Sequence, residues 1–409
     1  MIIKNISLNS NNTRTILSAD FAFRGEKFRQ IFFRVENKYK NFIFYDASPF
    51  LASFILPCMK RRENITIEGT VSDKILTTLP KIMDVVERWN VGFKKISVKV
   101  AHIAKDRTHP KATGSFFTGG VDSFYTYLKN KKDITHFILI HGCDIQLKNT
   151  SFFSEIENTI NKIVRKEKLN LIIVESNYRE IIEPVLEWEW NLGNALGAVG
   201  LLLRNRIKNI YIPGGMRWDQ LCPYGTHPDL DPLWSTDKLT IIHDGCEYSR
   251  LEKIRNSISR SSLALKYLRV CCHTLKGQYN CNHCFKCIQT KIELLCANAL
   301  HKARTFDRTI TPSLVNKLYY NNKLNFNLFG EEVLNYLKKH DQYPRLQEAL
   351  TKSLQKSKNP NLLRRFTNFI SFLDKKYNHR RLYLSIFGIT SNHDRTPLFK
   401  LISNLGLIK

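Results

Sequence analysis

The 409-residue chain has no long hydrophobic run, and no stretch approaches the ~20 consecutive apolar residues that a membrane-spanning helix needs. Residues 1–12 are polar and rich in asparagine, so they lack the apolar core of a secretory signal. We therefore expect a cytoplasmic protein with no membrane-embedded part. Hydrophobic residues still make up 43% of the chain, which is enough for buried cores. At about 150 residues per domain, the length predicts two or three domains.

Acidic residues are scarce. The chain has 36 Asp and Glu against 63 Lys and Arg, for a formal net charge of +27. Such an excess indicates an anionic partner, either a nucleic acid or a phosphorylated substrate. A solvated surface in a chain rich in lysine, asparagine and isoleucine explains it equally well. The charge is spread along the sequence, with a heavy share in the last quarter, and spread charge is weaker evidence for nucleic-acid binding than one dense basic arm.

The cysteines also lack the spacing that is typical of a disulfide framework. Five of the ten cysteines lie in one short segment, which in a cytosolic chain is typical of a metal site. These are Cys271, Cys272, Cys281, Cys284 and Cys287. Two-residue gaps separate the last three, and such gaps let thiolates meet on one tetrahedral zinc ion. The fourth ligand is then Cys271 or Cys272, with His273 and His283 as weaker competitors and an iron–sulfur cluster as the alternative.

Hydrophobic patterning divides the chain into three regions and shows no internal repeat. Residues 1–105 predict an α+β region. Residues 106–299 alternate apolar strands with helices, which predicts a doubly wound α/β domain whose parallel sheet is covered on both faces. Residues 300–409 predict a basic helical appendage. Ligands bind at the carboxyl ends of such strands, where the loops at Gly119, Gly142 and Gly214 are expected.

The expected elements can be given by residue number. Strands are expected at 31–34, 42–45, 65–68, 95–100, 115–118, 136–141, 171–175 and 209–213. Helices are expected at 70–90, 123–129, 154–168, 187–206, 333–340, 345–354 and 362–377. The first of these helices should break or kink at Pro80. Residues 104–114 should form a connector.

The strongest chemical signal is the segment Phe116-Phe117-Thr118-Gly119-Gly120-Val121-Asp122-Ser123, where an apolar strand meets two glycines and then a helix. The glycines allow a sharp turn and a close approach to an anion. The freed N–H groups form a nest for phosphate oxygens at the helix start. Asp122 is suited to capping the helix or holding Mg²⁺, which takes hard oxygen ligands. We therefore assign nucleotide binding to Thr118, Gly119, Gly120, Val121, Asp122 and Ser123.

This segment resembles the Ser-Gly-Gly-x-Asp-Ser signature of the PP-loop ATP pyrophosphatases, with Thr118 in the place of the first serine. The resemblance implies the adenine-nucleotide α-hydrolase fold, with ATP and Mg²⁺ at the loop. It also implies that ATP is cleaved between its α- and β-phosphates, that a substrate oxygen is adenylated, and that a nucleophile displaces AMP. The segment lacks the Gly-Lys-Ser or Gly-Lys-Thr of a Walker A loop.

Together with the cysteine cluster, the loop resembles the 7-cyano-7-deazaguanine synthase (QueC) family of queuosine biosynthesis, in which one cysteine precedes a Cys-x-x-Cys-x-x-Cys run. The resemblance covers residues 115–298, and the regions on either side are extra. It implies a carboxy-deazaguanine substrate, its conversion through an amide to a nitrile, and a structural zinc ion. QueC-like proteins with extensions are similar to those of antiviral defence systems in bacteria, where related chemistry is directed at a protein.

A long loop between the two motifs supplies candidate substrate contacts. It is dense in polar and aromatic residues and is similar to the substrate loop of the QueC family. We place Asp219, His227 and Asp229 near the substrate on this basis. Long loops without periodicity are often functional, and the alternative is an ordinary connecting loop.

Two further pairs complete the candidate site. Arg250 and Lys253 share one helix face because they are three residues apart. They are candidates to stabilise the leaving pyrophosphate, and a lysine of the QueC family in a comparable place favours Lys253; solvated basic residues are the alternative. His141 and Gly214 end strands beside the loop and are candidate nucleotide contacts.

The sequence therefore predicts an ATP-dependent enzyme that adenylates a carboxylate or an amide, after which ammonia or an amine displaces AMP. The catalytic residues expected are Asp122, Ser123, Arg250 and Lys253. One alternative is a tRNA-modifying enzyme, for thiolation or lysidine formation, with Cys143, Cys222 and Cys246 as candidate redox cysteines. Another is a non-catalytic nucleotide sensor. The expected partners are ATP, a small carboxylate or deazapurine, and, through the extensions, a protein or a second copy of the chain.

Overall fold

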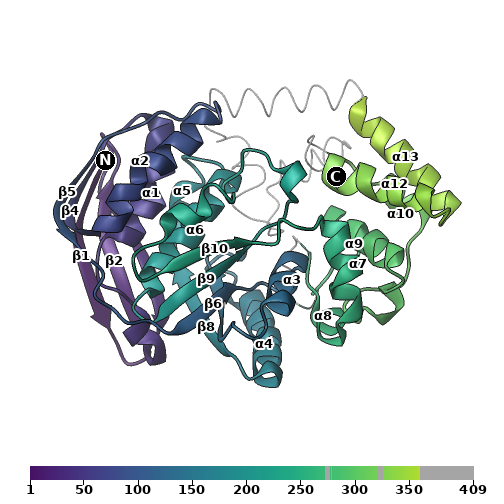
Figure 1. Ribbon diagram of the computed structural model, residues 1–409, viewed down its shortest axis with the longest axis horizontal. Helices are drawn as coiled ribbons and strands as arrows, with labels where there is room; N and C mark the ends of the chain where they lie inside the picture. The colour runs from purple at the N-terminus through teal and green to yellow at the C-terminus, as the bar shows by residue number, and fades with distance from the viewer. Residues whose placement is uncertain (272–276, 278, 321–325, 360–409) are drawn as a thin grey trace.

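The computed structural model describes residues 1–271, 277, 279–320 and 326–359. A ten-stranded sheet runs in the order β10-β9-β6-β7-β8-β3-β2-β1-β4-β5. The N-terminal strands form one end of the molecule and the C-terminal helices lie at the other (Figure 1). The strands are β1 (Ile2–Ser10), β2 (Arg14–Ala22), β3 (Arg29–Glu36), β4 (Ile65–Ser72), β5 (Val98–Ala104), β6 (Ala112–Phe116), β7 (His136–His141), β8 (Asn170–Ser176), β9 (Ile207–Pro213) and β10 (Thr240–Asp244).

The strands β10, β9, β6, β7 and β8 form a parallel block. The chain passes between them through α3 (Val121–Lys129), α4 (Thr150–Glu167), α5 (Tyr178–Ile182) and α6 (Trp188–Leu203). Parallel neighbours need such crossovers. At the other end of the sheet, β4 pairs in parallel with β1 and β5. The prediction of an α/β fold with a large, mostly parallel sheet is confirmed.

The burial of strand β7 shows that both faces of this block are covered. All residues of the strand are buried. Successive side chains alternate between the faces of a sheet, so Phe137 and Leu139 pack in one core, with residues of α3 and α4. Ile138 and Ile140 pack in another core, with residues of α6 and of α1 (Ser48–Arg61). An unbroken apolar strand is typical of a parallel sheet covered on both faces.

The N-terminal region extends the same sheet. Strand β3 pairs antiparallel with β8, and β2 and β1 follow in antiparallel register. Helix α1 packs against α6 of the parallel block, and α2 (Asp73–Arg88) packs against β4. The domain boundaries at residues 105 and 299 stay predictions.

Some expected elements of this region are wrong. Residues 42–45 form no strand, because a 3-10 turn (Asn37–Phe42) precedes them and the Phe44 N–H bonds to the Leu202 carbonyl of α6 at 2.8 Å. The predicted helix at 70–90 starts only at Asp73, since β4 continues through Ser72. Pro80 lies inside α2 without ending it. The buried face of this helix supplies packing that outweighs the lost hydrogen bond.

The remaining helices follow the parallel block. They are α7 (Arg250–Asn256), α8 (Ser262–Tyr267), α9 (Phe285–Cys296), α10 (Pro312–Asn316), α12 (Glu332–Lys339) and α13 (Pro344–Lys358). The helices expected at 333–340 and 345–354 are confirmed as α12 and α13, and the one expected at 362–377 lies outside the described residues. A third core joins α7 and α9 to α10, α12 and α13. In the described ranges, no helix combines the length and apolar character needed to cross a bilayer.

A buried ion cluster ties the N-terminal region to the parallel block. Arg204, which follows α6, is fully buried, and its guanidinium bonds to Asp46 and, at 3.1 Å, to Asp106. Its face lies 3.7 Å from the ring centroid of Phe44. Asp46 precedes α1 and Asp106 follows β5, so one cation joins three distant segments. Ionised groups at this depth are tolerated only with such partners.

Removing the buried cation from this cluster should lower the free energy of unfolding much more than removing an exposed cation. We expect Arg204→Ala to lower the free energy of unfolding by about 3–5 kcal/mol, because it leaves two buried carboxylates unpaired. Arg206→Ala, at an exposed position two residues away, should change it by less than ~0.5 kcal/mol. Denaturant titration of both variants measures the difference, and equal effects would contradict the proposed role of the cluster.

Candidate functional site

The glycine turn between β6 and α3 has the backbone that an anion nest needs. Gly119 has φ +78°, a conformation in which a side chain is strained, although its surroundings would leave room for a Cβ atom. Its carbonyl accepts a 2.8 Å hydrogen bond from the Arg269 N–H. Gly120 follows in extended conformation as the residue that precedes α3. The two glycines therefore turn the chain from the carboxyl end of β6 into the helix.

The first turn of α3 is open toward this nest. Within the described residues, no side chain caps the helix. The Ser123 hydroxyl donates to the Gly120 carbonyl at 3.1 Å, and the Phe124 N–H bonds to the same carbonyl at 3.0 Å. The earlier N–H groups of a helix have no partner inside it, and together with the helix dipole they favour an anion. Thr118 is half-buried beside the turn.

Two cations of α7 converge on Asp122 in this first turn. The Lys253 ammonium lies 3.1 Å from one carboxylate oxygen of Asp122 and 2.5 Å from the Gly214 carbonyl, and its side chain is fully buried. A guanidinium nitrogen of Arg250 lies 3.8 Å from the other oxygen. The two residues act from one helix face, as their three-residue spacing predicts. The structure thus brings together Asp122, Arg250, Lys253 and Gly214.

The carboxyl ends of β9 and β10 complete this edge of the sheet. The Gly214 N–H bonds to the Asp244 carbonyl at 2.7 Å. A Cβ atom on Gly214 would lie 2.4 Å from the His243 ring, so only glycine fits there. Gly245 has φ +104° and passes close to the Lys253 ammonium. The glycine turn and the loops after β9 and β10 therefore meet at the carboxyl ends of the parallel strands, where sheets of this kind bind ligands.

The other predicted nucleotide contact, His141, is packed into the protein. Its Nε2 donates to the Gln146 carbonyl at 3.0 Å. Its ring stacks on Phe153 with centroids 3.9 Å apart. Its Nδ1 lies 3.7 Å from a carboxylate oxygen of Glu175, and the pKa of Glu175 is lowered to about 2, first by His141 and then by Arg34. A nucleotide role for His141 stays a prediction.

The three predicted substrate residues separate into two places. Asp219 is exposed and accepts hydrogen bonds from Arg217 at 2.6 and 2.8 Å, which lowers its pKa. Arg217 also bonds to Glu252 of α7 at 3.1 Å, so Asp219 lies next to the helix that carries the two cations.

By contrast, His227 is buried beside Trp89, with ring centroids 5.5 Å apart, and its Nδ1 accepts the Asp229 N–H at 3.1 Å. The Asp229 carboxylate is exposed. Trp89 belongs to the N-terminal region, and Asp229 belongs to the same loop as His227.

Sequence reasoning gave no role to two residues that the structure places beside the site. His243 donates its Nδ1–H to Asp231 at 2.7 Å, and both side chains are buried. Burial lowers the pKa of His243, but the interactions with Asp231 and Cys246 together outweigh this effect and raise the pKa to about 9. His243 ends β10, a strand that was not expected. The signal available was the short apolar run Leu239-Thr240-Ile241-Ile242, because polar residues after such runs lie at the ligand edge.

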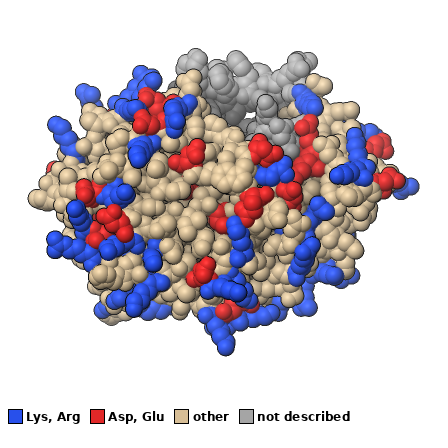
Figure 2. Space-filling view, in the orientation of Figure 1, with Lys and Arg blue, Asp and Glu red and all other residues tan. Residues whose placement is uncertain are grey.

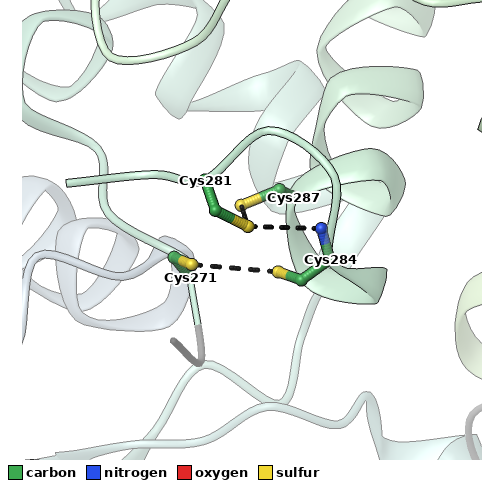
Figure 3. Close-up of side chains that lie close together, drawn as sticks. All are labelled: Cys271, Cys281, Cys284 and Cys287. Carbon is green, nitrogen blue, oxygen red and sulfur yellow. Dashed lines mark hydrogen bonds between the residues drawn. The ribbon is translucent and has the colours of Figure 1, made fainter. Parts of the chain in front are cut away.

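A second centre lies close to the phosphate loop. Cys271, Cys281, Cys284 and Cys287 are all buried, and their sulfur atoms lie within 4.8 Å of one another. Figure 3 shows the four side chains pointing toward one another from the chain before α9 and from its first turn. The Sγ–Sγ distances are 3.9 Å for the pair 271 and 284 and for the pair 281 and 287.

These distances match a four-thiolate metal site. Metal–sulfur bonds of ~2.3 Å in a tetrahedron place the sulfurs about 3.8 Å apart. The donors therefore fit a metal ion such as zinc, and four thiolates fill its coordination sphere. Cys271 takes part in the group, whereas Cys272 and His273 lie outside the described residues.

The backbone around Cys271 couples this centre to the phosphate loop. The Asn280 side chain accepts the N–H groups of Val270 and Cys271 at 2.9 and 3.2 Å, and it donates to the Leu268 carbonyl at 2.9 Å. Between these residues, the Arg269 N–H holds the Gly119 carbonyl. A metal ion at the cysteines would therefore fix the segment 268–271, which supports the glycine turn.

We expect the purified protein to carry roughly one tightly bound metal ion per chain, in line with a single four-thiolate site. Cys284→Ser should lose most of this metal, because a hydroxyl is a poor replacement for a thiolate. Cys222→Ser, at a half-buried cysteine outside the group, should keep it. Elemental analysis of the proteins measures the stoichiometry, and equal metal in both variants would contradict the assignment.

Comparison with known proteins gave no family model, curated protein or solved structure that matches this chain.

Proposed function

We propose that the protein is an ATP-dependent enzyme of the PP-loop type that activates a carboxylate or an amide by adenylation. One observation carries the proposal. Helix α3 has no side-chain cap at its start and follows Gly119, which has a positive φ. Arg250 and Lys253 lie beside Asp122 in the first turn of this helix, at the edge where a parallel sheet binds ligands. Anion-binding N–H groups, a carboxylate and two cations are the groups that phosphoryl chemistry requires.

The residues suggest a division of roles toward ATP. The N–H groups of the first turn of α3 would bind a phosphate oxygen, and Ser123 would keep the turn closed through its bond to Gly120. Asp122 carries both cations in the structure and is partly exposed. Its carboxylate suits a magnesium ion, which prefers such oxygens and which would neutralise phosphate charge. Lys253 and Arg250 would then face the phosphates, where they stabilise the charge that develops on pyrophosphate.

The proposed reaction has two steps. A carboxylate oxygen of the substrate attacks the α-phosphorus of ATP, so a new P–O bond forms while the bond to the leaving pyrophosphate breaks. An amine nitrogen then attacks the activated carbonyl carbon, AMP departs with the bridging oxygen, and the nitrogen releases a proton. The resemblance to the QueC family supports a deazapurine acid as the substrate and ammonia as the amine.

The cysteine centre has a structural role in this proposal. We assign it zinc, which is suited to a closed set of four thiolates. Such a site leaves no open coordination position for a substrate. Its contribution would be to hold the segment 268–271, and through it the Gly119 carbonyl, in place.

The charge pattern on the face drawn in Figure 2 favours a small substrate over an RNA at this face. Figure 2 shows acidic side chains in a band across the middle of the face, between the sheet and the C-terminal helices, with lysine and arginine mostly around it. An anionic polymer is repelled by such a band. Two of the three thiols considered for sulfur transfer also do not suit that reaction, because burial raises the pKa of Cys143 far above its usual value and raises that of Cys222 as well.

The decisive test measures release of AMP and pyrophosphate from ATP and Mg²⁺ with carboxy-deazaguanine and ammonia, followed by mass spectrometry of the products. We expect Asp122→Ala to lower the rate by about 10²–10³-fold, because it removes the charge that organises both cations. Asp133→Ala, an exposed acid beyond the other end of α3, should keep the rate of the original protein.

ATP cleavage with another acid or with tRNA, and none with the deazapurine, would retain the adenylation chemistry and reject the deazapurine. No cleavage with any of these substrates would reject the enzyme and favour a nucleotide sensor.

Backbone conformation at Gly119 gives a second test. Gly119→Ala and Gly25→Ala both force a side chain into a positive φ, near +78° and +80°, so each should destabilise the protein by about 1–2 kcal/mol. Only Gly119→Ala should weaken ATP binding, by roughly tenfold or more, since only that turn forms the anion nest. Calorimetric titration with ATP and Mg²⁺ compares the two, and equal affinities would argue against phosphate binding at this turn.

A further inference from the structure

Glu293 is a fully buried carboxylate that contacts one of the two site cations. It lies on α9, and its Oε2 accepts a hydrogen bond from the Nε of Arg250 at 3.2 Å. The neighbouring Thr290 hydroxyl accepts a second bond from Arg250, at 2.9 Å from a terminal nitrogen. These two contacts leave the other terminal nitrogen turned toward Asp122, 3.8 Å away. The guanidinium is thus held from behind by α9 and faces the phosphate loop in front.

The C-terminal helical region holds Glu293 in turn. The Gln289 amide donates to the other Glu293 oxygen at 3.1 Å and to the Phe329 carbonyl at 2.8 Å. The carbonyl oxygen of Gln289 accepts the Tyr320 hydroxyl at 3.1 Å. Tyr320 and Phe329 both belong to the segment between α10 and α12. A chain of hydrogen bonds therefore runs from this segment through Gln289 and Glu293 to Arg250.

A second contact from the same region reaches the start of α7. Ser249 precedes α7 and caps it, together with Glu252. Its hydroxyl donates to Glu332 of α12. Leu251 of α7 packs in the core that α10, α12 and α13 share. The C-terminal helices therefore contact the N-terminal end of the helix that carries Arg250 and Lys253.

We infer that Gln289 and Glu293 are positioning residues through which the C-terminal helical region aims Arg250 at the phosphate loop. The inference rests on the proposed function of Arg250 in ATP cleavage. It gives residues 312–320 and 326–358 a role in that reaction, since these helices would set the geometry of a guanidinium that acts on the nucleotide. A displacement of about 1 Å in such a group is enough to slow a reaction strongly.

The charge of Glu293 makes this role sensitive to pH. Burial raises the pKa of Glu293 to about 7, although Arg250 opposes the shift. The other ionisable groups that act on it are Glu332 of α12, Tyr320 and Cys296. Above pH 7 the carboxylate is ionised and pairs with Arg250, and below pH 7 it becomes neutral and the pairing weakens. Because burial disfavours its charged form, replacing it by an amide should not destabilise the protein above pH 7.

The experiment compares the full-length protein with Glu293→Gln, Tyr320→Phe and Tyr343→Phe. Tyr343 is an exposed tyrosine of the same region, so Tyr343→Phe is the matched control. We measure kcat and KM for pyrophosphate release from about pH 5.5 to 9, and melting temperature at each pH. Inorganic pyrophosphate binding at pH 8 is measured by calorimetry.

We expect the kcat of the original protein to fall as the pH drops through about 7. Glu293→Gln should lower kcat roughly tenfold at pH 8 and remove this acid limb, with an unchanged or higher melting temperature. Tyr320→Phe should give a smaller loss, and Tyr343→Phe should match the original protein. A Glu293→Gln variant with the original kcat and pH profile would overturn the inference while leaving ATP cleavage intact.

If the original protein cleaves no ATP, the proposed function fails and pyrophosphate binding decides the inference separately. Binding that weakens roughly tenfold in Glu293→Gln would support it, and unchanged binding would overturn it. An original protein that binds no pyrophosphate would overturn both.

Discussion

A lysine ammonium with no exposure to water must be surrounded by acceptors, because burying an unpaired charge costs several kcal/mol. Lys253 meets this requirement with the Asp122 carboxylate and the Gly214 carbonyl. These acceptors come from the first turn of α3 and from the loop after β9, so the single cation fixes the distance between them. The Gly245 backbone passes close to the same ammonium, where a side chain would be crowded. Much of the site geometry therefore follows from the burial of one charge.

The same principle operates between the two halves of the sheet. Arg204 is buried with Asp46 and Asp106, which belong to segments far apart in the sequence. Removing any member leaves uncompensated charge, so the cluster favours the one arrangement in which all three meet. The N-terminal strands add to the edge of the parallel block through β3 and β8 rather than forming a sheet of their own. The ligand edge of β6, β9 and β10 is thereby backed by a wide, continuous sheet.

Support for the phosphate loop also comes from its C-terminal side. The Gly119 carbonyl is held by Arg269, two residues before Cys271 of the four-cysteine group. Arg250 is held by Glu293 of α9, the helix that begins at the last cysteines. A glycine turn is conformationally free on its own, and binding a phosphate would then require ordering it. The Arg269 N–H, close to the four-cysteine group, holds this turn instead, and α9 holds the Arg250 guanidinium that faces Asp122.

The local patterns of the sequence determined the elements that carry the site and the residue types within it. The unbroken apolar run of β7 indicated a strand buried on both faces, and the glycine pair before Asp122 indicated a strand-to-helix turn, because both depend on short-range sterics and periodicity. The two-residue gaps of the cysteines likewise indicated a metal site.

Long-range partners were decided only by the tertiary structure. Nothing near His243 in sequence marks Asp231 as its partner, and Glu293 lies far along the chain from the Arg250 that it holds. Strand β1 is largely exposed and β10 is short, so their pairing rather than their own pattern defines them. Burial is a property of the folded chain, and it alone decides which charges must find partners and therefore which distant residues meet.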